Sequence, residues 1–131
     1  MKKLIIIPAY NEGENIEKTI QNIQENAPEF DYVVINDCST DNTLQILQQN
    51  KLNHISLPIN LGIGGAVQTG YKYAFENGYD IAVQVDGDGQ HDVSYLEKMC
   101  IEMQNQNADM VIGSRFITKE GFQSTFMRRV G

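Results

Sequence analysis

Leu4-Ile5-Ile6-Ile7-Pro8, close to the start of the chain, carries the clearest indication of the fold. Four consecutive large apolar residues, three of them β-branched, are typical of a strand buried on both faces of a parallel sheet, and the proline is expected to end it. Apolar runs follow at residues 32–35, 81–85 and 110–112, and His54-Ile55-Ser56-Leu57 is a candidate for a short strand between them. The repetition predicts five strands in one sheet.

Segments with helical periodicity separate these apolar runs. Apolar residues recur every three or four positions at residues 14–26, 41–50, 65–76 and 94–106. Ser39 or Thr40 is the predicted N-cap of the second helix, and Asn77-Gly78 is expected to end the third. Because strands alternate with helices of about 10–15 residues, we predict an α/β, Rossmann-like fold with three α/β/α layers and a mostly parallel sheet.

Composition limits the class of protein. The chain has 131 residues, of which 41% are hydrophobic and 21% charged, as expected for one soluble domain. Its formal net charge of -7 argues against a nucleic-acid partner. Cys38 and Cys100 lie far apart without CxxC spacing, which favours two reduced thiols over a disulfide. No apolar run approaches a signal peptide or the roughly 20 residues of a membrane span. We therefore expect a cytoplasmic protein.

The pattern loosens after Gly113-Ser114-Arg115. The apolar residues beyond this point are Phe122, Phe126, Met127 and Val130. Their spacing predicts the start of a helix within residues 116–131. With Arg128-Arg129 beside it, this helix is expected either to lie at a membrane surface or to face the core. Since a domain seldom ends inside a helix, we expect a truncated chain, with residues 1–115 forming the binding domain.

Polar or glycine-rich loops follow each of the first four predicted strands. They occupy residues 8–13, 36–41, 60–65 and 86–92. In an open parallel sheet, ligands bind beyond the carboxyl ends of the strands, where all four loops are expected to lie. One such loop would mean little, but four at one edge predict a ligand-binding site.

The fourth loop carries the sharpest signal, because Asp86 and Asp88 are separated by a single residue. Gly87 and Gly89 permit a tight turn and a close approach of the backbone to a ligand. Two carboxylates this close repel each other unless a cation neutralises them. Mg²⁺ or Mn²⁺ suits such a pair, together with diphosphate oxygens. The alternative is a solvated aspartate turn.

Two other protein classes place aspartates in this way, and both fit poorly. An EF-hand that begins at Asp86 needs glycine at its sixth position, where this chain has His91, and it needs a helix in place of the preceding strand. A haloacid-dehalogenase-type phosphatase needs threonine, lysine and acidic partners downstream, yet beyond the fourth loop Asp109 is the only aspartate.

The other loops carry weaker signals. Tyr10 is suited to contact a nucleobase, Glu12 to accept hydrogen bonds from ribose hydroxyls, and Asp37 to accept a base N–H. An exposed turn is an equally good reading of the first loop, and helix capping is the better reading of Ser39 and Asp41. The glycines at 62, 64 and 65 lack the spacing of a dinucleotide or P-loop fingerprint. Arg115 suits phosphate recognition or is an ordinary surface arginine.

Taken in order, these motifs resemble family 2 glycosyltransferases. The matching stretches are Ile6-Ile7-Pro8-Ala9-Tyr10-Asn11-Glu12, Asn36-Asp37-Cys38-Ser39-Thr40-Asp41, Asn60-Leu61-Gly62, Asp86-Gly87-Asp88-Gly89-Gln90-His91 and Gly113-Ser114-Arg115. The chain is most similar to the branch that contains dolichyl-phosphate mannose synthases and polyprenyl-phosphate glucosyltransferases. The resemblance implies a GT-A fold, a nucleoside-diphosphate sugar donor, Mg²⁺ or Mn²⁺, and inverting transfer to a polyprenyl-phosphate or glycan acceptor in cell-envelope glycan synthesis.

The resemblance also implies roles for individual residues. The nucleotide would be held by Pro8, Ala9, Tyr10, Glu12, Asp37, Asp86 and Gly87. The metal and diphosphate would be approached by Asp86, Asp88 and Gln90, with Asp88 as the catalytic residue, and Arg115 would meet a phosphate of the acceptor or donor. Residues 116–131 would begin the acceptor-side region, so we expect this chain to bind nucleotide weakly and to transfer sugar poorly. The parent protein is expected at the cytoplasmic face of a membrane.

Two alternatives remain open at the level of sequence. A sugar nucleotidyltransferase shares the sheet and a metal-binding aspartate, but it usually carries an arginine in a glycine-rich loop after the first strand. Residues 8–14 contain no arginine. The second alternative is a non-catalytic module that binds a sugar nucleotide or a divalent metal.

Overall fold

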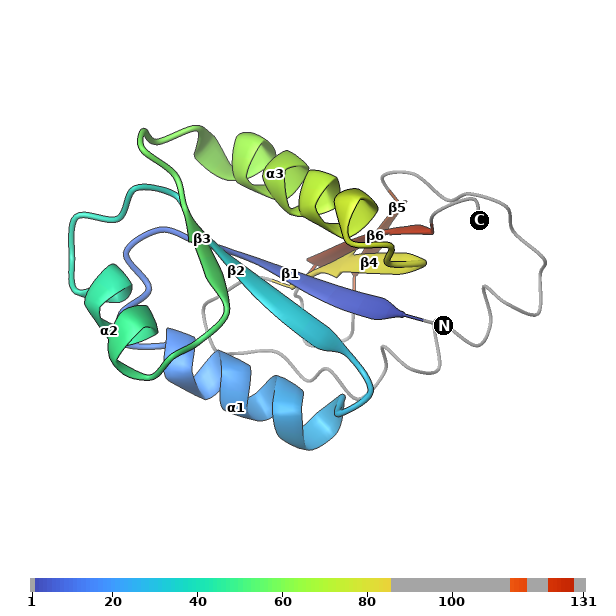
Figure 1. The fold of residues 1–131 in the computed structure, drawn as a ribbon, viewed down its shortest axis with the longest axis horizontal. Helices are drawn as coiled ribbons and strands as arrows, with labels where there is room; N and C mark the ends of the chain where they lie inside the picture. Colours follow the sequence, from blue (N-terminus) through green and yellow to red (C-terminus); the bar gives the residue numbers. More distant parts are fainter. Residues whose placement is uncertain (1, 86–113, 118–122, 129–131) are drawn as a thin grey trace.

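A computed structural model of the chain describes residues 2–85, 114–117 and 123–128 (Figure 1). In chain order, the elements are β1 (Lys3–Ala9), α1 (Ile16–Asn26), β2 (Asp31–Asn36), α2 (Thr43–Gln49), β3 (His54–Ser56), α3 (Gly62–Glu76), β4 (Ile81–Gln84), β5 (Ser114–Ile117) and β6 (Gln123–Arg128). These strands form one sheet in the order β3-β2-β1-β4-β6-β5. The first four strands in this order are parallel to one another, which confirms the predicted α/β fold.

Strand β1 lies at the centre of the parallel part and explains why residues 4–7 are uniformly apolar. It pairs with β2 on one side and β4 on the other, and Leu4 to Ile7 are fully buried. Alternate side chains point to opposite faces of a strand. Ile5 and Ile7 therefore pack in the core under α1 and α2, while Leu4 and Ile6 pack in the core under α3.

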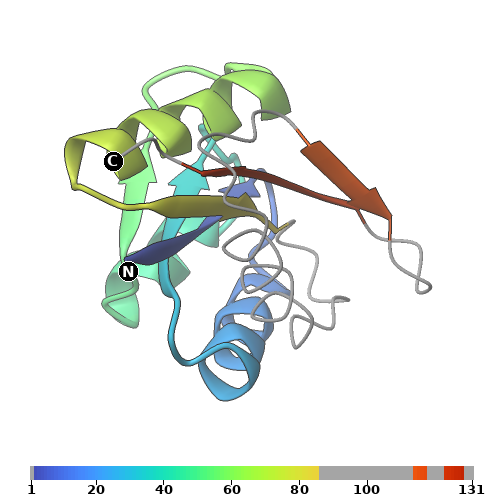
Figure 2. The same ribbon diagram turned by 90° about the vertical axis from the view of Figure 1, so that its right-hand side faces the viewer.

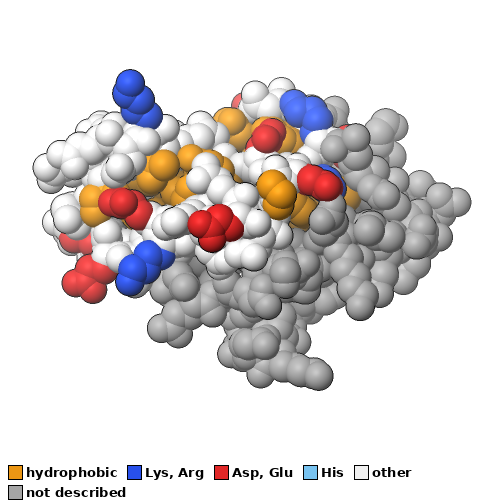
Figure 3. Space-filling view, turned by 90° about the horizontal axis from the view of Figure 1, so that it is seen from below, with side chains coloured by type: hydrophobic (Ala, Val, Ile, Leu, Met, Phe, Trp, Pro, Cys, Tyr) orange, Lys and Arg blue, Asp and Glu red, His pale blue; other side chains and the backbone are white. Residues whose placement is uncertain are grey.

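The two helical layers follow from this alternation. Helix α1 contributes Ile16, Ile20 and Ile23 to one core, and α3 contributes Ala66 and Ala74 to the other. Figures 1 and 2 show α1 and α3 on opposite faces of the sheet. Seen from the side of α1, acidic and basic side chains are interspersed with apolar ones over the described surface (Figure 3). The result is the predicted three-layer arrangement.

Helix α3 approaches β1 closely at Gly70. A Cβ atom added there would lie 2.3 Å from Cγ2 of Ile6, well inside van der Waals contact. Glycine inside a helix costs about 1 kcal/mol relative to alanine. Here its small size allows the helix to pack directly on the central strand, which accounts for a glycine in mid-helix.

Strand β1 runs on through Pro8, so the prediction that Pro8 ends the strand is wrong. Pro8 still aligns with Ile35 of β2, and Ala9 aligns with Asn36. The carbonyl of Ala9 accepts the N–H of Asp37, so the backbone groups of Ala9 face β2. Successive residues of a strand direct their backbone groups to opposite sides, and the nitrogen of Pro8 therefore faces β4. The pairing of β1 with β4 reaches only Ile6, and the missing N–H of proline therefore removes no bond of that ladder.

The prediction of a helix within residues 116–131 is wrong for residues 123–128. This segment is β6, which runs antiparallel to β4, with Val83 opposite Phe126. The outer edge of β4 offers backbone groups that need partners, and strand pairing satisfies them whatever the local helical spacing. Because Phe126 and Met127 lie in this strand, the hypothesis that they belong to a helix at a membrane surface is also wrong.

Strand β5 pairs antiparallel with β6, and Arg115 lies opposite Thr125. Arg115 thus lies within β5, at the edge of the described sheet. The strand expected at residues 110–112 and the helix expected at 94–106 lie outside the described residues. The division at residue 115 stays a prediction, and β5 spans it.

Helix α3 begins at Gly62, three residues before the predicted start. The glycines at 62, 64 and 65 therefore belong to its first turn, and Gly62 has a φ of +78°, a conformation that glycine adopts readily. Within the described residues, no helix has the length and apolar character required to cross a membrane.

Candidate nucleotide-binding site

Three loops meet at the carboxyl edge of the parallel strands, as the sequence predicted for them. The N–H of Asp37 donates to the carbonyl of Ala9 at 2.9 Å, and the N–H of Leu57 donates to that of Asn36 at 2.9 Å. These bonds continue the sheet ladder one residue beyond the strand ends. The loops after β1, β2 and β3 consequently leave the sheet side by side.

Asp37 is the buried acid of this edge, with only 3% of its surface exposed. Its Oδ1 accepts the N–H of Leu61 at 2.7 Å, and its carbonyl accepts the Asn60 side-chain amide at 3.2 Å. The carboxylate thus anchors the start of α3, where the helix dipole favours a negative charge. Its Oδ2 has no hydrogen-bond partner among the described residues.

Asn11 connects the first loop to the second. It has a φ of +54°, a conformation that asparagine tolerates better than most residues. Its Oδ1 accepts the N–H groups of Thr40 at 2.8 Å and Asp41 at 3.2 Å, and its own N–H donates to the Ser39 hydroxyl at 3.0 Å. We call these bonds the Asn11 clasp.

A second set of bonds ties the same loops together one step further along the chain. The N–H of Glu12 donates to the Thr43 hydroxyl at 3.1 Å, and that of Gly13 donates to Asp41 Oδ2 at 3.2 Å. A Cβ at Gly13 would lie 2.1 Å from the Asn42 side-chain oxygen, so the loops touch here. The start of α1 is therefore held against the start of α2.

The residues that cap the start of α2 agree only in part with the prediction. Asp41 Oδ1 accepts the N–H of Thr43, the first residue of α2, at 2.9 Å, which confirms its capping role. The N-cap position itself is Asn42, so the assignment to Ser39 or Thr40 is wrong. The Ser39 hydroxyl instead donates to Asn36 Oδ1 at 2.6 Å, inside the loop. This short-range bond competes with capping.

Replacing Asp41 with asparagine is expected to destabilise the protein at pH 7 more than at pH 3. Partial burial raises the pKa of Asp41, but hydrogen bonds from the Thr43 hydroxyl and from the N–H groups of Thr43 and Gly13 outweigh it, so the net pKa lies below its ordinary value. A lowered folded-state pKa stabilises above the unfolded value and is lost as pH falls through the folded one. Urea unfolding at the two pH values measures the difference in the free energy of unfolding between the original protein and Asp41→Asn. A difference of the same size at pH 7 and pH 3 would contradict the prediction.

The side chains predicted to contact a nucleoside occupy different positions at this edge. Pro8 and Ala9 are buried in β1, and Tyr10 is 47% exposed just beyond it. Glu12 is half-buried, and its Oε2 accepts the Asn15 side-chain amide at 3.3 Å. Tyr10 and Asp37 follow neighbouring strands, β1 and β2, so an exposed tyrosine and a buried acid stand in adjacent loops.

The residues predicted for the metal and diphosphate, Asp86, Gly87, Asp88 and Gln90, lie outside the described residues. The chain leads toward this edge, because the N–H of Val85 still donates to the Ile6 carbonyl at 2.9 Å. In the described ranges, no three His, Cys, Asp or Glu side chains are grouped as metal ligands.

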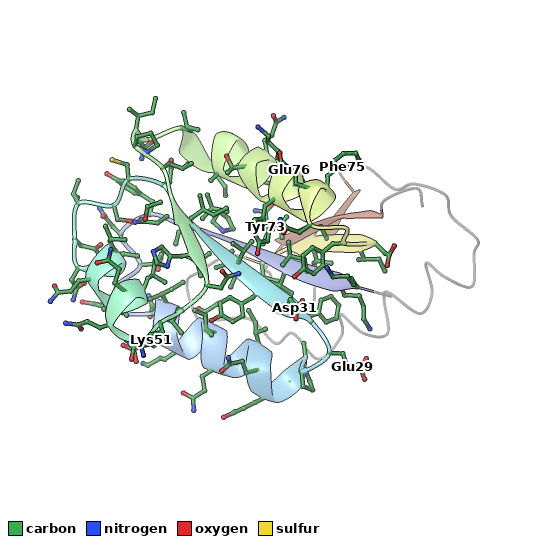
Figure 4. All side chains as sticks on the ribbon, viewed as in Figure 1. Glu29, Asp31, Lys51, Tyr73, Phe75 and Glu76 are labelled. Carbon is green, nitrogen blue, oxygen red and sulfur yellow. The ribbon has the colours of Figure 1, made fainter. Side chains whose placement is uncertain are left out.

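A hollow of about 530 Å³ lies at the opposite edge, where β2 and β4 begin. Aromatic and polar side chains line it, among them Phe30, Tyr32 and Asn53. The Tyr79 hydroxyl donates to Asp31 Oδ2 at 2.7 Å across it, and Figure 4 labels Asp31 at the start of β2. None of the described residues that line the hollow is predicted for the nucleotide site.

Comparison with known sequences decides the family. The sequence profile of glycosyl transferase family 2 matches residues 4–130, nearly the whole chain. The chain belongs to glycosyl transferase family 2. The resemblance noted in the sequence motifs is thereby confirmed.

Relatives of this family 2 chain include enzymes named for lipid-phosphate acceptors. It is 33% identical over 120 residues to an undecaprenyl-phosphate mannosyltransferase of Micrococcus luteus, covering 88% of the chain and 49% of the relative. It is 34% identical over 137 residues to a UDP-N-acetylglucosamine–dolichyl-phosphate N-acetylglucosaminyltransferase of Methanococcus voltae, covering 92% and 54%. The chain spans about half the length of these relatives.

Solved structures confirm the GT-A fold expected for the family. The S. aureus protein TarS (residues 1–349), in complex with UDP, matches with a TM-score of 0.67 and 28% identity. The match covers 86% of this chain and 35% of that one. The parallel strands with helices on both faces are thus the GT-A architecture of a family 2 glycosyltransferase.

The sequence motifs singled out Asp37 and Tyr10 as predicted ligand contacts but not the residues that hold their loops together. Asn11, Thr43 and the Leu61 N–H each carry a hydrogen bond between loops. Every residue other than proline has a backbone N–H, so the sequence does not show which of these groups bonds between loops. Asn11 had a weak signal, since asparagine after a strand end often adopts positive φ.

Proposed function

We propose that this chain forms the donor-binding half of a glycosyltransferase that transfers a sugar from a nucleoside diphosphate to a polyprenyl phosphate. One observation carries the proposal: the buried Asp37 has a carboxylate oxygen without a described partner, next to the loop that carries the exposed Tyr10. Uncompensated burial of a carboxylate oxygen is costly, and a ligand N–H would offset that cost.

The nucleoside is proposed to sit between the first and second loops. Asp37 would accept an N–H of the base and Tyr10 would lie against its ring, while Glu12 would accept the ribose hydroxyls. Pro8 and Ala9 would form the floor, since both are buried at the end of β1. The similarity to TarS, which binds UDP, supports a nucleoside diphosphate as the ligand class.

The diphosphate is proposed to lie next to the fourth loop. Asp86, Asp88 and Gln90 have the oxygen donors that Mg²⁺ or Mn²⁺ prefers, and Gly87 lets the backbone approach the nucleotide. When bound, the metal would neutralise the charge of the leaving diphosphate. Asp88 is proposed as the catalytic residue of this group.

The acceptor is proposed to be a polyprenyl phosphate, as in the names of the Micrococcus and Methanococcus relatives. An acceptor phosphate is already an anion, so inverting transfer would require no strong general base. Arg115 is proposed to bind a phosphate of the acceptor or donor, since a guanidinium forms paired hydrogen bonds with phosphate oxygens. A lipid acceptor would bring the whole enzyme to the cytoplasmic face of a membrane.

Calorimetric titration with UDP and GDP, with and without Mn²⁺, tests the donor site. We expect metal-dependent binding of one nucleotide, and a loss of at least about tenfold in affinity in Asp88→Ala, because a metal ligand is removed. Asp92→Ala is the matched control, since it removes a carboxylate from the same loop without touching a proposed ligand. Binding of neither nucleotide, or equal losses in both variants, would contradict the proposal.

A further inference from the structure

The two loops of the proposed nucleoside site turn in the same unusual way. Asn11 follows Tyr10 and has a φ of +54°, and Cys38 follows Asp37 and has a φ of +58°. Side chains with a Cβ pay about 1–3 kcal/mol for such a conformation, so the surroundings must maintain it. Each strained residue comes directly after a residue proposed to contact the nucleoside.

The Asn11 clasp joins these two turns to each other. One side chain accepts two N–H groups and a hydroxyl from the second loop, at Thr40 and Asp41. The reverse bond, from the Asn11 N–H to the Ser39 hydroxyl, comes from the same residue, and Ser39 also donates to Asn36 Oδ1 at the end of β2. A continuous chain of hydrogen bonds therefore runs from the first loop to the strand that presents Asp37.

We propose that Asn11 is a positioning residue, which sets the separation between Tyr10 and Asp37 through its hydrogen bonds to the second loop. This inference rests on the proposed function, because it assigns Asn11 a task only if Tyr10 and Asp37 bind a nucleoside. Asn11 itself need not touch the ligand. Its oxygen is already engaged by three donors of the second loop.

If Asn11 positions the site, its replacement should weaken contacts with the nucleoside and not those with the diphosphate. The clasp joins the loops after β1 and β2, whereas the diphosphate is assigned to the loop after β4. Loosening the clasp should therefore weaken binding of the nucleoside and of its diphosphate by the same factor. A general loss of folding would instead reduce affinity in proportion to the unfolded fraction, which a melting curve detects.

Two substitutions separate the hydrogen bonds from the backbone conformation. Asn11→Gly keeps the positive φ at no steric cost but removes the acceptor oxygen, whereas Asn11→Asp keeps an oxygen at the same place. Lys51→Gly is the matched control, because Lys51 has a φ of +53° just after α2 and belongs to neither loop (Figure 4). It reports what glycine does to stability at such a position.

The measurement is NMR titration of each protein with uridine and guanosine, and calorimetry with UDP and GDP in the presence of Mn²⁺. Uncharged nucleosides serve for Asn11→Asp, since its added carboxylate would repel a diphosphate. We expect Asn11→Gly to bind about tenfold more weakly to nucleoside and diphosphate alike, with a melting temperature close to that of Lys51→Gly. Asn11→Asp should bind nucleoside within about threefold of the original protein.

Three results would overturn the inference. Asn11→Gly with unchanged affinity would show that the clasp does not position the site. Equal losses in Asn11→Asp and Asn11→Gly would show that the acceptor oxygen is not the relevant group. If the original protein binds neither nucleotide, the proposed function itself fails, and the role of Asn11 fails with it.

Discussion

Asp37→Asn should weaken binding of the nucleoside diphosphate by about 10- to 100-fold without unfolding the protein. The asparagine oxygen can still accept the Leu61 N–H, so the start of α3 keeps its anchor. The NH₂ group of asparagine would then take the place of the carboxylate oxygen that faces the base. Because both this group and the base N–H are donors, no hydrogen bond could form between them. A hydrogen bond to a charged group is worth about 1.5–3 kcal/mol, which corresponds to this loss.

Calorimetry with UDP and GDP measures the change, with Asp31→Asn as the matched control. Asp31 begins the strand that Asp37 follows, so the control alters the charge by the same amount at the other end of β2. It should leave nucleotide affinity unchanged. If Asp37→Asn and Asp31→Asn bind equally well, Asp37 does not contact the base.

Gly70→Val is expected to produce the largest loss of folding stability. The first added carbon would lie 2.3 Å from Ile6 Cγ2, and Ile6 is fully buried in the central strand. Neither the β-branched Ile6 nor the helix backbone can move freely, so α3 would be pushed away from β1. Overpacking of this kind costs about 1–3 kcal/mol, and valine should reach the upper end of that range.

Gly64→Ala supplies the control for Gly70→Val in the same helix. A Cβ at Gly64 would have no atom within 4 Å, so only the helical propensity changes. We expect a gain of about 0.5–1 kcal/mol in the free energy of unfolding, measured by urea denaturation. If Gly70→Val is as stable as the original protein, the close packing of α3 on Ile6 is wrong.

The parallel half of the fold was predictable because its signals are local. Continuous apolar runs mark β1, β2 and β4, and the helical spacing of Ile16, Ile20 and Ile23 marks α1. Strand β6 was not predictable in the same way. Phe126 and Met127 carry no decisive local preference, and the unpaired edge of β4 determined their conformation. A pairing partner about 40 residues away is invisible to any local pattern.

The candidate site likewise has a part that was predictable from local sequence and a part that was not. Tyr10, Glu12 and Asp37 were predicted at one edge because strand ends in a parallel sheet must meet there, and the structure brings their loops together. The start of α3 at Gly62 was missed, since it depends on an N–H bond to Asp37 from another loop. The predicted roles of these side chains stay predictions until nucleotide binding is measured.

Local patterns in the sequence were enough to predict the class of fold, the alternation of strands and helices in its parallel part, and the edge at which polar loops gather, because periodicity and turn residues act over a few positions. Three contacts became visible only in the folded chain: Asn11 bonds Thr40 and Asp41, Gly70 packs against Ile6, and β6 extends the sheet beside β4. These contacts join residues that are remote in the chain. Their energies depend on distances that exist only once the sheet has formed.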